Sequence, residues 1–410
     1  MVRIIVASTP VHGHVSPLLS VASHLVRRCH EVTVLTGSRF EARARAAGAD
    51  FAALPEGADW DERNLGQAFP ERGRLRPGPE QLGFDLKHIF GDPVPAQYAA
   101  LRSLLTRFPA TAVISDNLFL GALPLALGQI PGNRPATIAL GIAPPTVPGD
   151  FNPEDFHGAQ QYIERVFDSV DAPLPGFVLD SLLRVPDHFL QLTVPGFEYP
   201  RDDAPASFAF IGPLPPEPST PRLLPDWWDE LPAERPVVVV TQGTFANTDL
   251  ADLVVPTLRA LAGEDALVIA ATGRKDGPAA VRALMHEGVP GNVRLADYVP
   301  FELLLPATDV LVTNGGYGGV HTALRHGVPQ GVAGATEDKP KVAARVAWSG
   351  AGIDLRTGRP SETALRTAVT DVLGVPDYRT RARELCAEMN RFDALGHIAL
   401  LVEKHAAERG

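Results

Sequence analysis

The chain has 410 residues, of which 45% are hydrophobic and 21% charged, and its formal net charge at pH 7 is -11. At about 150 residues per domain this length predicts two or three domains, and the composition excludes a disordered chain. The acidic balance makes nucleic acid an unexpected partner. Cys29 and Cys386 are too few for a disulfide framework or a zinc quartet. With no apolar run of the roughly 18 residues that a membrane span needs and no signal-peptide pattern, we expect a cytoplasmic protein.

The first fifty residues predict a strand, a helix and a second strand. Residues 4–7 form a short apolar run typical of a buried parallel strand, and residues 31–36 form another. Apolar residues recur at helical spacing between them, with Ser16 as the expected cap and Pro17 as the first helical residue. In such a βαβ unit the loop after the first strand lies on the ligand side of the sheet.

Further along the chain, strand patterns alternate with loop-rich stretches. Residues 56–95 and 144–186 are rich in Pro, Gly and mixed charge and predict loops with short helices, whereas residues 111–115 and 136–140 predict strands. Residues 237–241, 266–271, 292–295 and 310–313 predict four more buried strands, and the pattern after residue 361 is helical. The expected fold is α/β, with two doubly wound Rossmann-like domains facing a central cleft.

The domain boundaries follow from these patterns. We expect an N-terminal domain over residues 1–200, a Pro-rich interdomain linker over 201–235 and a second Rossmann-like domain over 236–385. Residues 386–410 are expected to form a C-terminal helix that packs back on the N-terminal domain.

A glycine-rich segment follows the predicted strand at residues 310–313. It reads Asn-Gly-Gly-Tyr-Gly-Gly from Asn314 to Gly319, and a helix is expected from about Gly319 to His326, with Gly327 as its stop. Such a loop directs backbone N–H groups and a helix N-terminus at an anion, and a diphosphate fits. The alternative is a tight turn without a ligand. The dinucleotide fingerprint is excluded because its third glycine is replaced by His321.

Two groups in the first half could carry acid–base chemistry. His12 and His14 follow the first predicted strand, and Asp116 follows the strand at 111–115. A histidine in a ligand-side loop suits a general base, and an aspartate can orient it and stabilise its cation. A structural histidine and an aspartate that caps a helix are the alternatives. A metal site would need a third ligand, which the neighbouring sequence lacks.

The Asp-Trp-Asp motif at Asp59 to Asp61 has the spacing seen in metal-dependent sugar transferases. It lies in a loop-rich stretch with no strand before it. We therefore interpret the spacing as coincidental.

Taken together, the motifs resemble the natural-product glycosyltransferases of the two-domain GT-B fold, the family of bacterial antibiotic and macrolide glycosyltransferases and of plant secondary-metabolite UDP-glycosyltransferases. The resemblance covers nearly the whole chain. It rests on an ordered set of motifs: His14-x-x-Pro17, Ile114-Ser-Asp116, Ile211-Gly-Pro213, Thr241-Gln-Gly-Thr244, Tyr298-Val-Pro300, and Asn314-Gly-Gly316 through Asp338.

The resemblance implies an inverting, metal-independent transfer of a sugar from a UDP- or dTDP-sugar to a hydroxyl of a small lipophilic natural product of polyketide, macrolide or flavonoid type. His14 would be the base and Asp116 its partner. The donor is expected to contact Gly243, Thr244, Tyr298, Val299, Asn314, Gly316, Gly318, Gly319, Thr322, Asp338 and Lys339. The acceptor, bound by the N-terminal domain, is expected to contact Trp60, Phe69, Phe84, Phe90 and Phe119. No cofactor is implied beyond the nucleotide sugar, and a monomer and a homodimer are both possible.

Several positions depart from the family pattern. Asn314 replaces the usual histidine of the glycine motif, and Gly319 replaces a Ser or Thr. Thr322 stands where a ribose-binding Glu is usual, and Lys339 replaces the Gln after Asp338. These departures concern the donor site, so the sequence leaves the sugar and its nucleotide open. It also leaves open the acceptor, transfer to O rather than N or C, and two other functions: a sugar-nucleotide 2-epimerase of the same fold and a non-catalytic sugar-nucleotide-binding protein.

Overall fold

The computed structural model describes residues 1–76, 78–128, 134–146, 153–215, 224–231, 234–243, 247 and 249–408. The chain divides into two compact units, each an α/β domain built on one sheet. Unit 1 comprises Met1–Leu192, Pro200–Leu214 and Phe392–Gly410, and unit 2 comprises Thr193–Tyr199 and Pro215–Arg391. No helix among the described residues is both long enough and apolar enough to cross a membrane.

Unit 1 contains a seven-stranded sheet in the order β3-β2-β1-β4-β5-β6-β7, and every neighbouring pair is parallel. Its central strands are almost wholly buried, as expected of a parallel sheet covered on both faces. The strands are β1 (Arg3–Ala7), β2 (Glu31–Thr36), β3 (Asp50–Ala53), β4 (Ala112–Asp116), β5 (Ala136–Gly141), β6 (His188–Gln191) and β7 (Phe208–Phe210).

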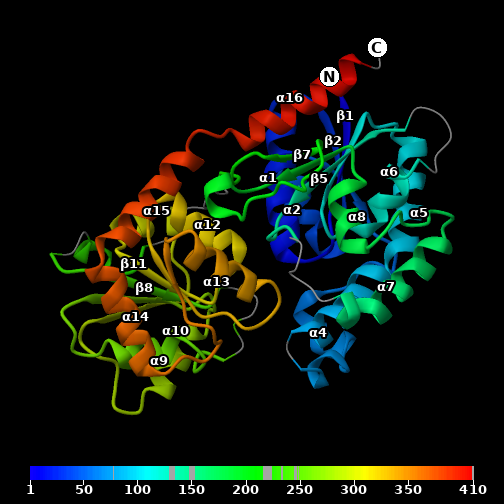
Figure 1. Cartoon of the computed structure of the whole chain (residues 1–410). Coiled ribbons are helices and arrows are strands. Elements are labelled where there is room, and N and C mark those ends of the chain that lie inside the picture. The colour runs from blue at the N-terminus through cyan, green and yellow to red at the C-terminus, as the bar shows by residue number, and fades with distance from the viewer. Residues whose placement is uncertain are drawn as a thin grey trace. The chain divides into compact units, whose positions relative to one another are not determined.

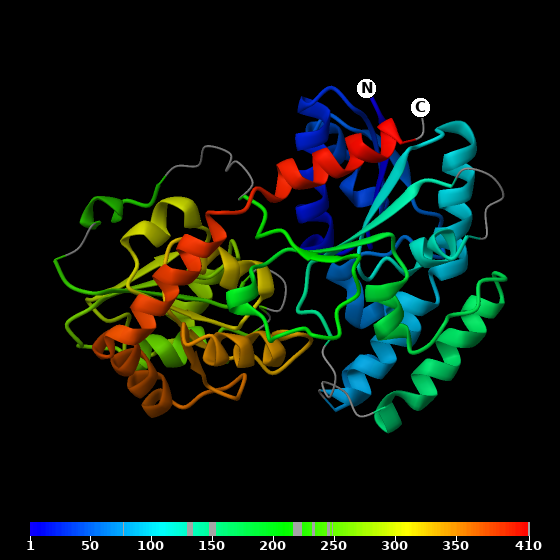
Figure 2. The ribbon, with the colours of Figure 1, turned by 45° about the horizontal axis from the view of Figure 1, so that its top comes forward.

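Helices cover this sheet, and one of them comes from the other end of the chain. The C-terminal helix α16 contributes Leu395, Ile398 and Val402 to the core that α1 and β1 share, and Figures 1 and 2 show it in red beside the blue N-terminal elements. The α-helices of unit 1 are α1 (His12–Arg27), α2 (Glu41–Ala46), α3 (Leu65–Ala68), α4 (Pro79–Phe84), α5 (Val94–Arg107), α6 (Leu123–Ala126), α7 (Pro153–Asp168), α8 (Val178–Arg184) and α16 (Ala394–Ala407). A π-helical turn, η4 (Asp85–Gly91), joins α4 to α5, and the 3-10 turns are η1 (Ser38–Phe40), η2 (Glu62–Asn64), η3 (Arg72–Arg74) and η5 (Leu120–Ala122).

Unit 2 repeats the design with a six-stranded parallel sheet in the order β10-β9-β8-β11-β12-β13. Its strands are β8 (Val237–Thr241), β9 (Leu267–Ala271), β10 (Val293–Ala296), β11 (Val310–Thr313), β12 (Gln330–Val332) and β13 (Gly352–Asp354). Its helices are α9 (Val254–Ala260), α10 (Gly277–Leu284), α11 (Phe301–Leu304), α12 (Tyr317–Arg325), α13 (Lys339–Trp348), α14 (Glu362–Gly374) and α15 (Pro376–Met389), with 3-10 turns η6 (Pro195–Phe197), η7 (Trp228–Glu230) and η8 (Leu305–Ala307). The prediction of two doubly wound Rossmann-like domains is confirmed.

Some local predictions were wrong. α1 begins at His12, so Ser16 does not cap it and Pro17 lies inside the helix. The Pro17 ring faces the carbonyl of Gly13, four residues earlier, and a glycine there adds no side chain to the crowding. The stretch predicted as loops at 144–186 contains the sixteen-residue helix α7. The predicted linker at 201–235 is not all linker, because β7 adds a strand to the sheet of unit 1.

The order of strands locates a ligand site in each unit. In unit 1, β1 lies between β2 and β4, and the strand order reverses there. In unit 2, β8 lies between β9 and β11, and the order reverses in the same way. In open α/β sheets, ligands bind beyond the carboxyl ends of the strands at such a reversal. The expected sites are therefore the loops after β1 and β4 in unit 1 and the loops after β8 and β11 in unit 2.

Candidate active site

His14 and Asp116 meet at the reversal point of unit 1. Asp116 is the last residue of β4, and His14 lies in the first turn of α1, which follows β1. Nδ1 of His14 lies 3.0 Å from Oδ1 of Asp116. The Asp116 carboxylate is buried, whereas 15% of the His14 side chain is exposed. A carboxylate only accepts hydrogen bonds, so Nδ1 carries the hydrogen and Nε2 keeps its lone pair for a substrate.

Four further hydrogen bonds hold the carboxylate of Asp116. Its Oδ2 accepts from the backbone N–H of Thr9 at 2.8 Å and from the hydroxyl of Ser8 at 3.2 Å. Its Oδ1 accepts from the backbone N–H of Leu118 at 3.0 Å and from the Thr9 hydroxyl at 3.4 Å. Ser8 and Thr9 were not predicted, although their place directly after the first strand put them at the same sheet edge. They orient the carboxylate that orients His14.

The N-terminus of α1 is capped from a distance by Glu62. No neighbouring side chain caps this helix. The backbone N–H of His12 instead donates to the buried carboxylate of Glu62, which also pairs with Arg39 at 3.0 Å. Burial raises the pKa of Glu62. Nothing in the sequence pattern indicated this contact, because it joins residues fifty positions apart.

His12 does not join His14 in a common site. Its Nδ1 accepts a hydrogen bond from Arg43 at 3.1 Å. Burial, assisted by the charges of Arg43 and Arg39, lowers the pKa of His12. The His12 ring therefore bonds Arg43, whereas Asp116 bonds His14.

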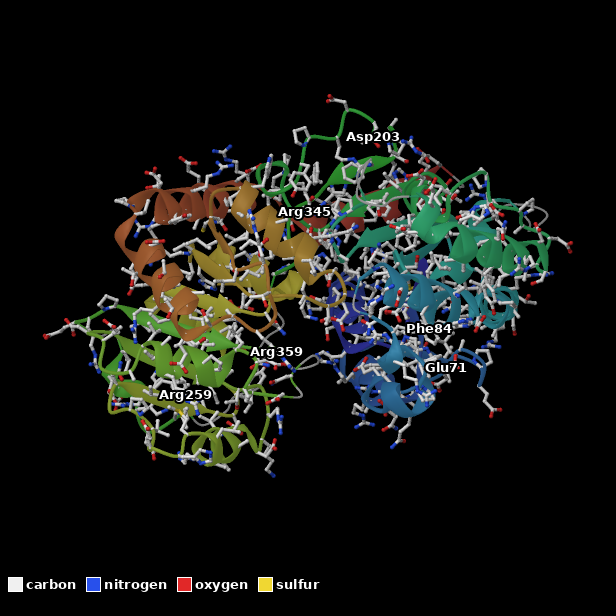
Figure 3. The ribbon with its side chains drawn as sticks, turned by 60° about the horizontal axis from the view of Figure 1, so that its bottom comes forward. Glu71, Phe84, Asp203, Arg259, Arg345 and Arg359 are labelled. Carbon is white, nitrogen blue, oxygen red and sulfur yellow. The ribbon has the colours of Figure 1, made fainter. Side chains whose placement is uncertain are left out.

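Three of the predicted acceptor aromatics form a continuous cluster on the loops after β3. Trp60 meets Phe69 edge to face at 6.0 Å between ring centroids, and Phe69 meets Phe84 at 6.2 Å. Phe84 is labelled in Figure 3, where it lies on α4. Phe90, on the π-helical turn, stacks against the His14 ring at 6.3 Å with an interplanar angle of 20°. Phe90 therefore brings an aromatic ring to the histidine itself.

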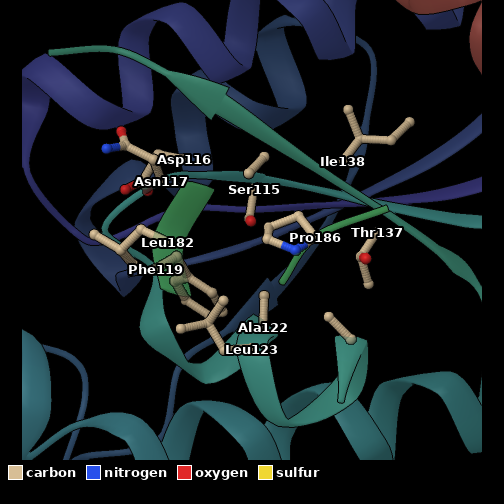
Figure 4. Close-up of a pocket in the computed structure, with 12 residues that line it drawn as sticks. Ser115, Asp116, Asn117, Phe119, Ala122, Leu123, Thr137, Ile138, Leu182 and Pro186 are labelled. Carbon is tan, nitrogen blue, oxygen red and sulfur yellow. The ribbon is translucent and has the colours of Figure 1, made fainter. Parts of the chain in front are cut away.

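Phe119 does not belong to this cluster. Its side chain is 2% exposed and packs in the core between β4 and α5. It lines a small pocket together with Ala122, Leu123 and Leu182, and Figure 4 shows this pocket beside Asp116 and Asn117. The structure thus gives Phe119 a packing role, because its apolar ring follows a buried strand end.

The carboxylates of Asp59 and Asp61 are engaged by neighbouring groups. Asp59 accepts a hydrogen bond from the backbone N–H of Ser38 at 3.0 Å. Asp61 caps η2 and pairs with Arg63 and, at 2.8 Å, with Arg39. The hydrogen bonds from Arg63 lower the pKa of Asp61 to about 2. Within the described part of the chain, no three His, Cys, Asp or Glu side chains are grouped so that they could hold a metal ion.

In unit 2 the glycine motif lies at the reversal point. β8 and β11 pair in register from Val238 with Val310 to Thr241 with Thr313, so the loops that follow them are neighbours. Nδ2 of Asn314 donates to the carbonyl of Gln242 at 2.5 Å, which joins the two loops directly. The amide nitrogen carries two hydrogens, and one of them is committed to this bond. Gly243, with φ of +71°, makes the turn after β8.

The N-terminus of α12 is formed by glycines with few neighbours in the described part of the chain. The helix begins at Tyr317, two residues earlier than expected, with Gly316 as its N-cap. The N–H groups of its first turn, which include those of Gly318 and Gly319, have no partner inside the helix. Among the described residues, no atom lies within 4 Å of a Cβ added at Gly316, Gly318 or Gly319. Backbone donors and open space together suit an anion.

The remaining predicted donor residues differ in their exposure and contacts. Tyr298, in the loop after β10, is 48% exposed, whereas Val299 is buried. The Thr322 hydroxyl donates to the carbonyl of Gly318 at 2.8 Å, which leaves its oxygen able to accept. Thr244 lies outside the described residues.

Asp338 and Lys339 lie at the start of α13. Asp338 is the N-cap of this helix, and Lys339 is its first residue. The buried ammonium of Lys339 contacts the Glu337 carboxylate and, at 3.3 Å, the Thr336 hydroxyl. Lys339 therefore forms an ion pair with Glu337 of the preceding loop. A glutamine at this position could not form an ion pair.

Comparison with solved structures identifies the fold class. The chain superposes on the calicheamicin glycosyltransferase CalG4 with a TM-score of 0.77 at 20% identity, covering 99% of this chain and 98% of the other. It superposes on the spinosyn rhamnosyltransferase SpnG with a TM-score of 0.72 at 22% identity, covering 98% and 99%. These likenesses establish the GT-B fold of sugar transferases.

Comparison of sequences then places the chain in a family. Residues 257–393 match the model of the erythromycin biosynthesis protein CIII-like C-terminal domain. UDP-glycosyltransferase 2 of Phaeomoniella chlamydospora is 38% identical, covering 99% of this chain and 96% of its own. The 4'-demethylrebeccamycin synthase of Lentzea aerocolonigenes is 38% identical, covering 98% and 99%. The chain belongs to the natural-product UDP-glycosyltransferase family, and it is a sugar-transferring enzyme.

Proposed function

We propose that this glycosyltransferase inverts the anomeric carbon of a UDP- or dTDP-sugar as it transfers the sugar to a hydroxyl of a small lipophilic natural product. The observation that carries the proposal is the hydrogen-bonded pair of His14 and Asp116 at the reversal point of the unit 1 sheet. The Nε2 atom is the proton acceptor. Binding of a nucleotide sugar needs no such pair, whereas deprotonation of an alcohol does.

The reaction is a single displacement. As His14 Nε2 takes the acceptor proton, the acceptor oxygen bonds to the anomeric carbon, and the bond from that carbon to the diphosphate oxygen breaks. Asp116 stabilises the imidazolium that forms. A retaining route by double displacement would need a free nucleophile, and the carboxylate of Asp116 is bound by five donors.

The leaving diphosphate is proposed to bind at the N-terminus of α12 without a metal. The first-turn N–H groups and the positive end of the helix stabilise the developing negative charge. The Asp59 and Asp61 carboxylates, which a metal-dependent route would require, are occupied by Ser38, Arg39 and Arg63.

The nucleotide is proposed to be uridine diphosphate or thymidine diphosphate, with its base stacked on the exposed ring of Tyr298. The sequence relatives carry UDP in their names, and the fold relatives SpnG and SsfS6 have each been solved with thymidine diphosphate. Thr322 offers one hydroxyl oxygen to the ribose and tolerates either sugar. Asp338 is proposed to bind the hydroxyls of the transferred sugar.

The acceptor is proposed to be a flat, lipophilic, hydroxylated molecule. Trp60, Phe69 and Phe84 form one aromatic cluster, and Phe90 stacks on the proposed base. Aromatic faces bind fused or conjugated rings through dispersion and burial of apolar area. One relative is named as a 4'-demethylrebeccamycin synthase and SpnG has been solved with spinosyn aglycone, which supports a natural-product acceptor.

The experiment that tests this proposal crosses UDP- and dTDP-sugars with an acceptor library of polyketides, macrolides and flavonoids. Mass spectrometry detects the glycosylated product, and NMR of its anomeric proton reports the stereochemistry. Transfer with inverted configuration from an α-linked donor is expected. Retained configuration, or sugar isomerisation without transfer, would contradict the mechanism.

A further inference from the structure

The segment Thr193–Tyr199 links the two units and belongs by its contacts to unit 2. It leaves the unit 1 sheet after β6, and it packs against α12 and α13. α12 carries the proposed diphosphate site, and α13 begins at the proposed sugar site. The 193–199 segment therefore contacts both donor helices without contributing to the glycine motif itself.

One contact fixes α12 through a buried histidine. The Thr193 hydroxyl lies 2.6 Å from Nε2 of His321, and Nδ1 of His321 lies 2.8 Å from the carbonyl of Tyr317. Because a carbonyl only accepts, Nδ1 carries the hydrogen and Nε2 accepts from Thr193. Phe197 packs edge to face on the same imidazole at 4.8 Å between ring centroids. The first residue of α12 is thus tied to Thr193 through two hydrogen bonds.

A second contact joins the two helices through one carboxylate. Oε2 of Glu198 lies 2.5 Å from Nε of Arg345, and both side chains are 1% exposed. Oε1 of Glu198 accepts from the Tyr317 hydroxyl at 3.3 Å. The Arg345 guanidinium also lies over the Tyr199 ring at 4.7 Å, and Figure 3 labels Arg345 on its helix. Glu198 therefore bridges the start of α12 to the middle of α13.

Both contacts converge on Tyr317, which stands between Gly316 and Gly318. The direction of the first-turn N–H groups depends on how this residue is held. A buried ion pair is an inefficient source of stability, since apolar residues of similar volume often serve as well or better. What the pair supplies here is a fixed connection between the start of α12 and the middle of α13.

We propose that Thr193 and Glu198 are positioning residues for the donor diphosphate. They act through His321 and Tyr317 to aim the N-terminus of α12, and they do not touch the donor themselves. The inference rests on the proposed donor site at that helix end.

Calorimetric binding of UDP to the full chain tests the inference with single-atom changes. Thr193→Val and Tyr317→Phe each remove one hydroxyl, whereas Thr193→Ser keeps it. Thr257→Val is the matched control, because this fully buried hydroxyl donates to the Leu253 carbonyl on α9 at 2.7 Å and lies outside the network. We expect Thr193→Val and Tyr317→Phe to weaken UDP binding about tenfold, the scale of one lost hydrogen bond. Thr193→Ser and Thr257→Val are expected to keep the wild-type affinity.

Glu198 needs a paired change, because Glu198→Gln alone leaves the buried Arg345 without its carboxylate and lowers stability as well. The double variant Glu198→Leu with Arg345→Met removes both charges together. We expect it to keep a cooperative thermal transition while its UDP affinity falls tenfold or more. UDP affinities within twofold of wild type in all these variants would overturn the inference but leave the proposed donor site intact. If the wild-type chain binds neither UDP nor dTDP, the proposed donor site is wrong and the inference is overturned with it.

Discussion

Replacing Asp116 by asparagine tests the chemistry of the dyad with almost no change in shape. Both oxygens of Asp116 accept a backbone N–H, from Thr9 on Oδ2 and from Leu118 on Oδ1. An asparagine therefore places its NH₂ group against one of these donors, whichever way it is turned. The orientation that keeps an oxygen on Oδ1 retains the bond to His14 but removes the negative charge.

The expected loss follows from the separation of the two charges. At 3.0 Å and an effective dielectric constant of about 20, a full ion pair between carboxylate and imidazolium is worth about 5 kcal/mol. If about half of the proton charge has reached His14 in the transition state, the lost stabilisation is about 2.5–3 kcal/mol. We therefore predict a fall in kcat of about a hundredfold, with UDP binding unchanged because the donor site lies in unit 2.

The assay is steady-state transfer at saturating donor, run for Asp116→Asn, His14→Ala and the double variant. Residues that act as a unit give non-additive losses. The kcat of the double variant should thus lie within a few fold of the kcat of His14→Ala. Losses that multiply, or an Asp116→Asn enzyme with wild-type kcat, would refute the reasoning.

Three further predictions concern pH, donor choice and metal. Burial lowers the pKa of His321 to about 4. As pH falls below 6.5, the unfolded chain therefore binds a proton at this residue before the folded chain does, and the free energy of unfolding should fall by about 2 kcal/mol between pH 7 and pH 5. A pH-independent difference in unfolding free energy between wild type and His321→Gln would contradict this. Thr322→Glu should shift the kcat/KM ratio of UDP-glucose to dTDP-glucose by about 10- to 150-fold toward UDP, the scale of a hydrogen bond to a charged group, and an unchanged ratio in a folded, active variant would mean that Thr322 does not face the ribose. EDTA should leave the rate unchanged, since the proposed diphosphate site uses the helix N-terminus in place of a metal. Loss of activity that magnesium or manganese restores would assign Asp59 and Asp61 a metal after all.

The strands that carry the sites were predictable, because buried parallel strands are continuous apolar runs. β2, β8 and β11 have the bounds that the sequence predicts. β3, β6, β7, β12 and β13 were missed. All five have only three or four residues, and β3, β7 and β13 are also only partly buried. α7 was missed because its sequence is polar on average, although Ala159, Ile163 and Phe167 recur at helical spacing and form a buried face.

The site was predictable where chemistry follows a strand end and not where it depends on distant packing. His14, Asp116 and the glycine motif each lie at or just after a strand end. The strand order places His14 and Asp116 at the reversal point of unit 1 and the glycine motif at the reversal point of unit 2. Glu62 and Glu198 escaped prediction, because each acts through a contact with a residue far away in the chain. Cys29 adopts φ of +63° directly after α1, in a conformation that favours glycine, and the backbone keeps this turn despite the side chain.

The central claim is that His14 is the base, and turnover compared with donor binding tests it most directly. His14→Ala should lower kcat by about a hundredfold or more, the scale of losing a general base, and should leave the UDP dissociation constant at its wild-type value. His12→Ala is the matched control, because its ring contacts Arg43 and not Asp116, and it should retain most of the activity. Full turnover by His14→Ala, with the enzyme folded and saturated with donor, would contradict the account.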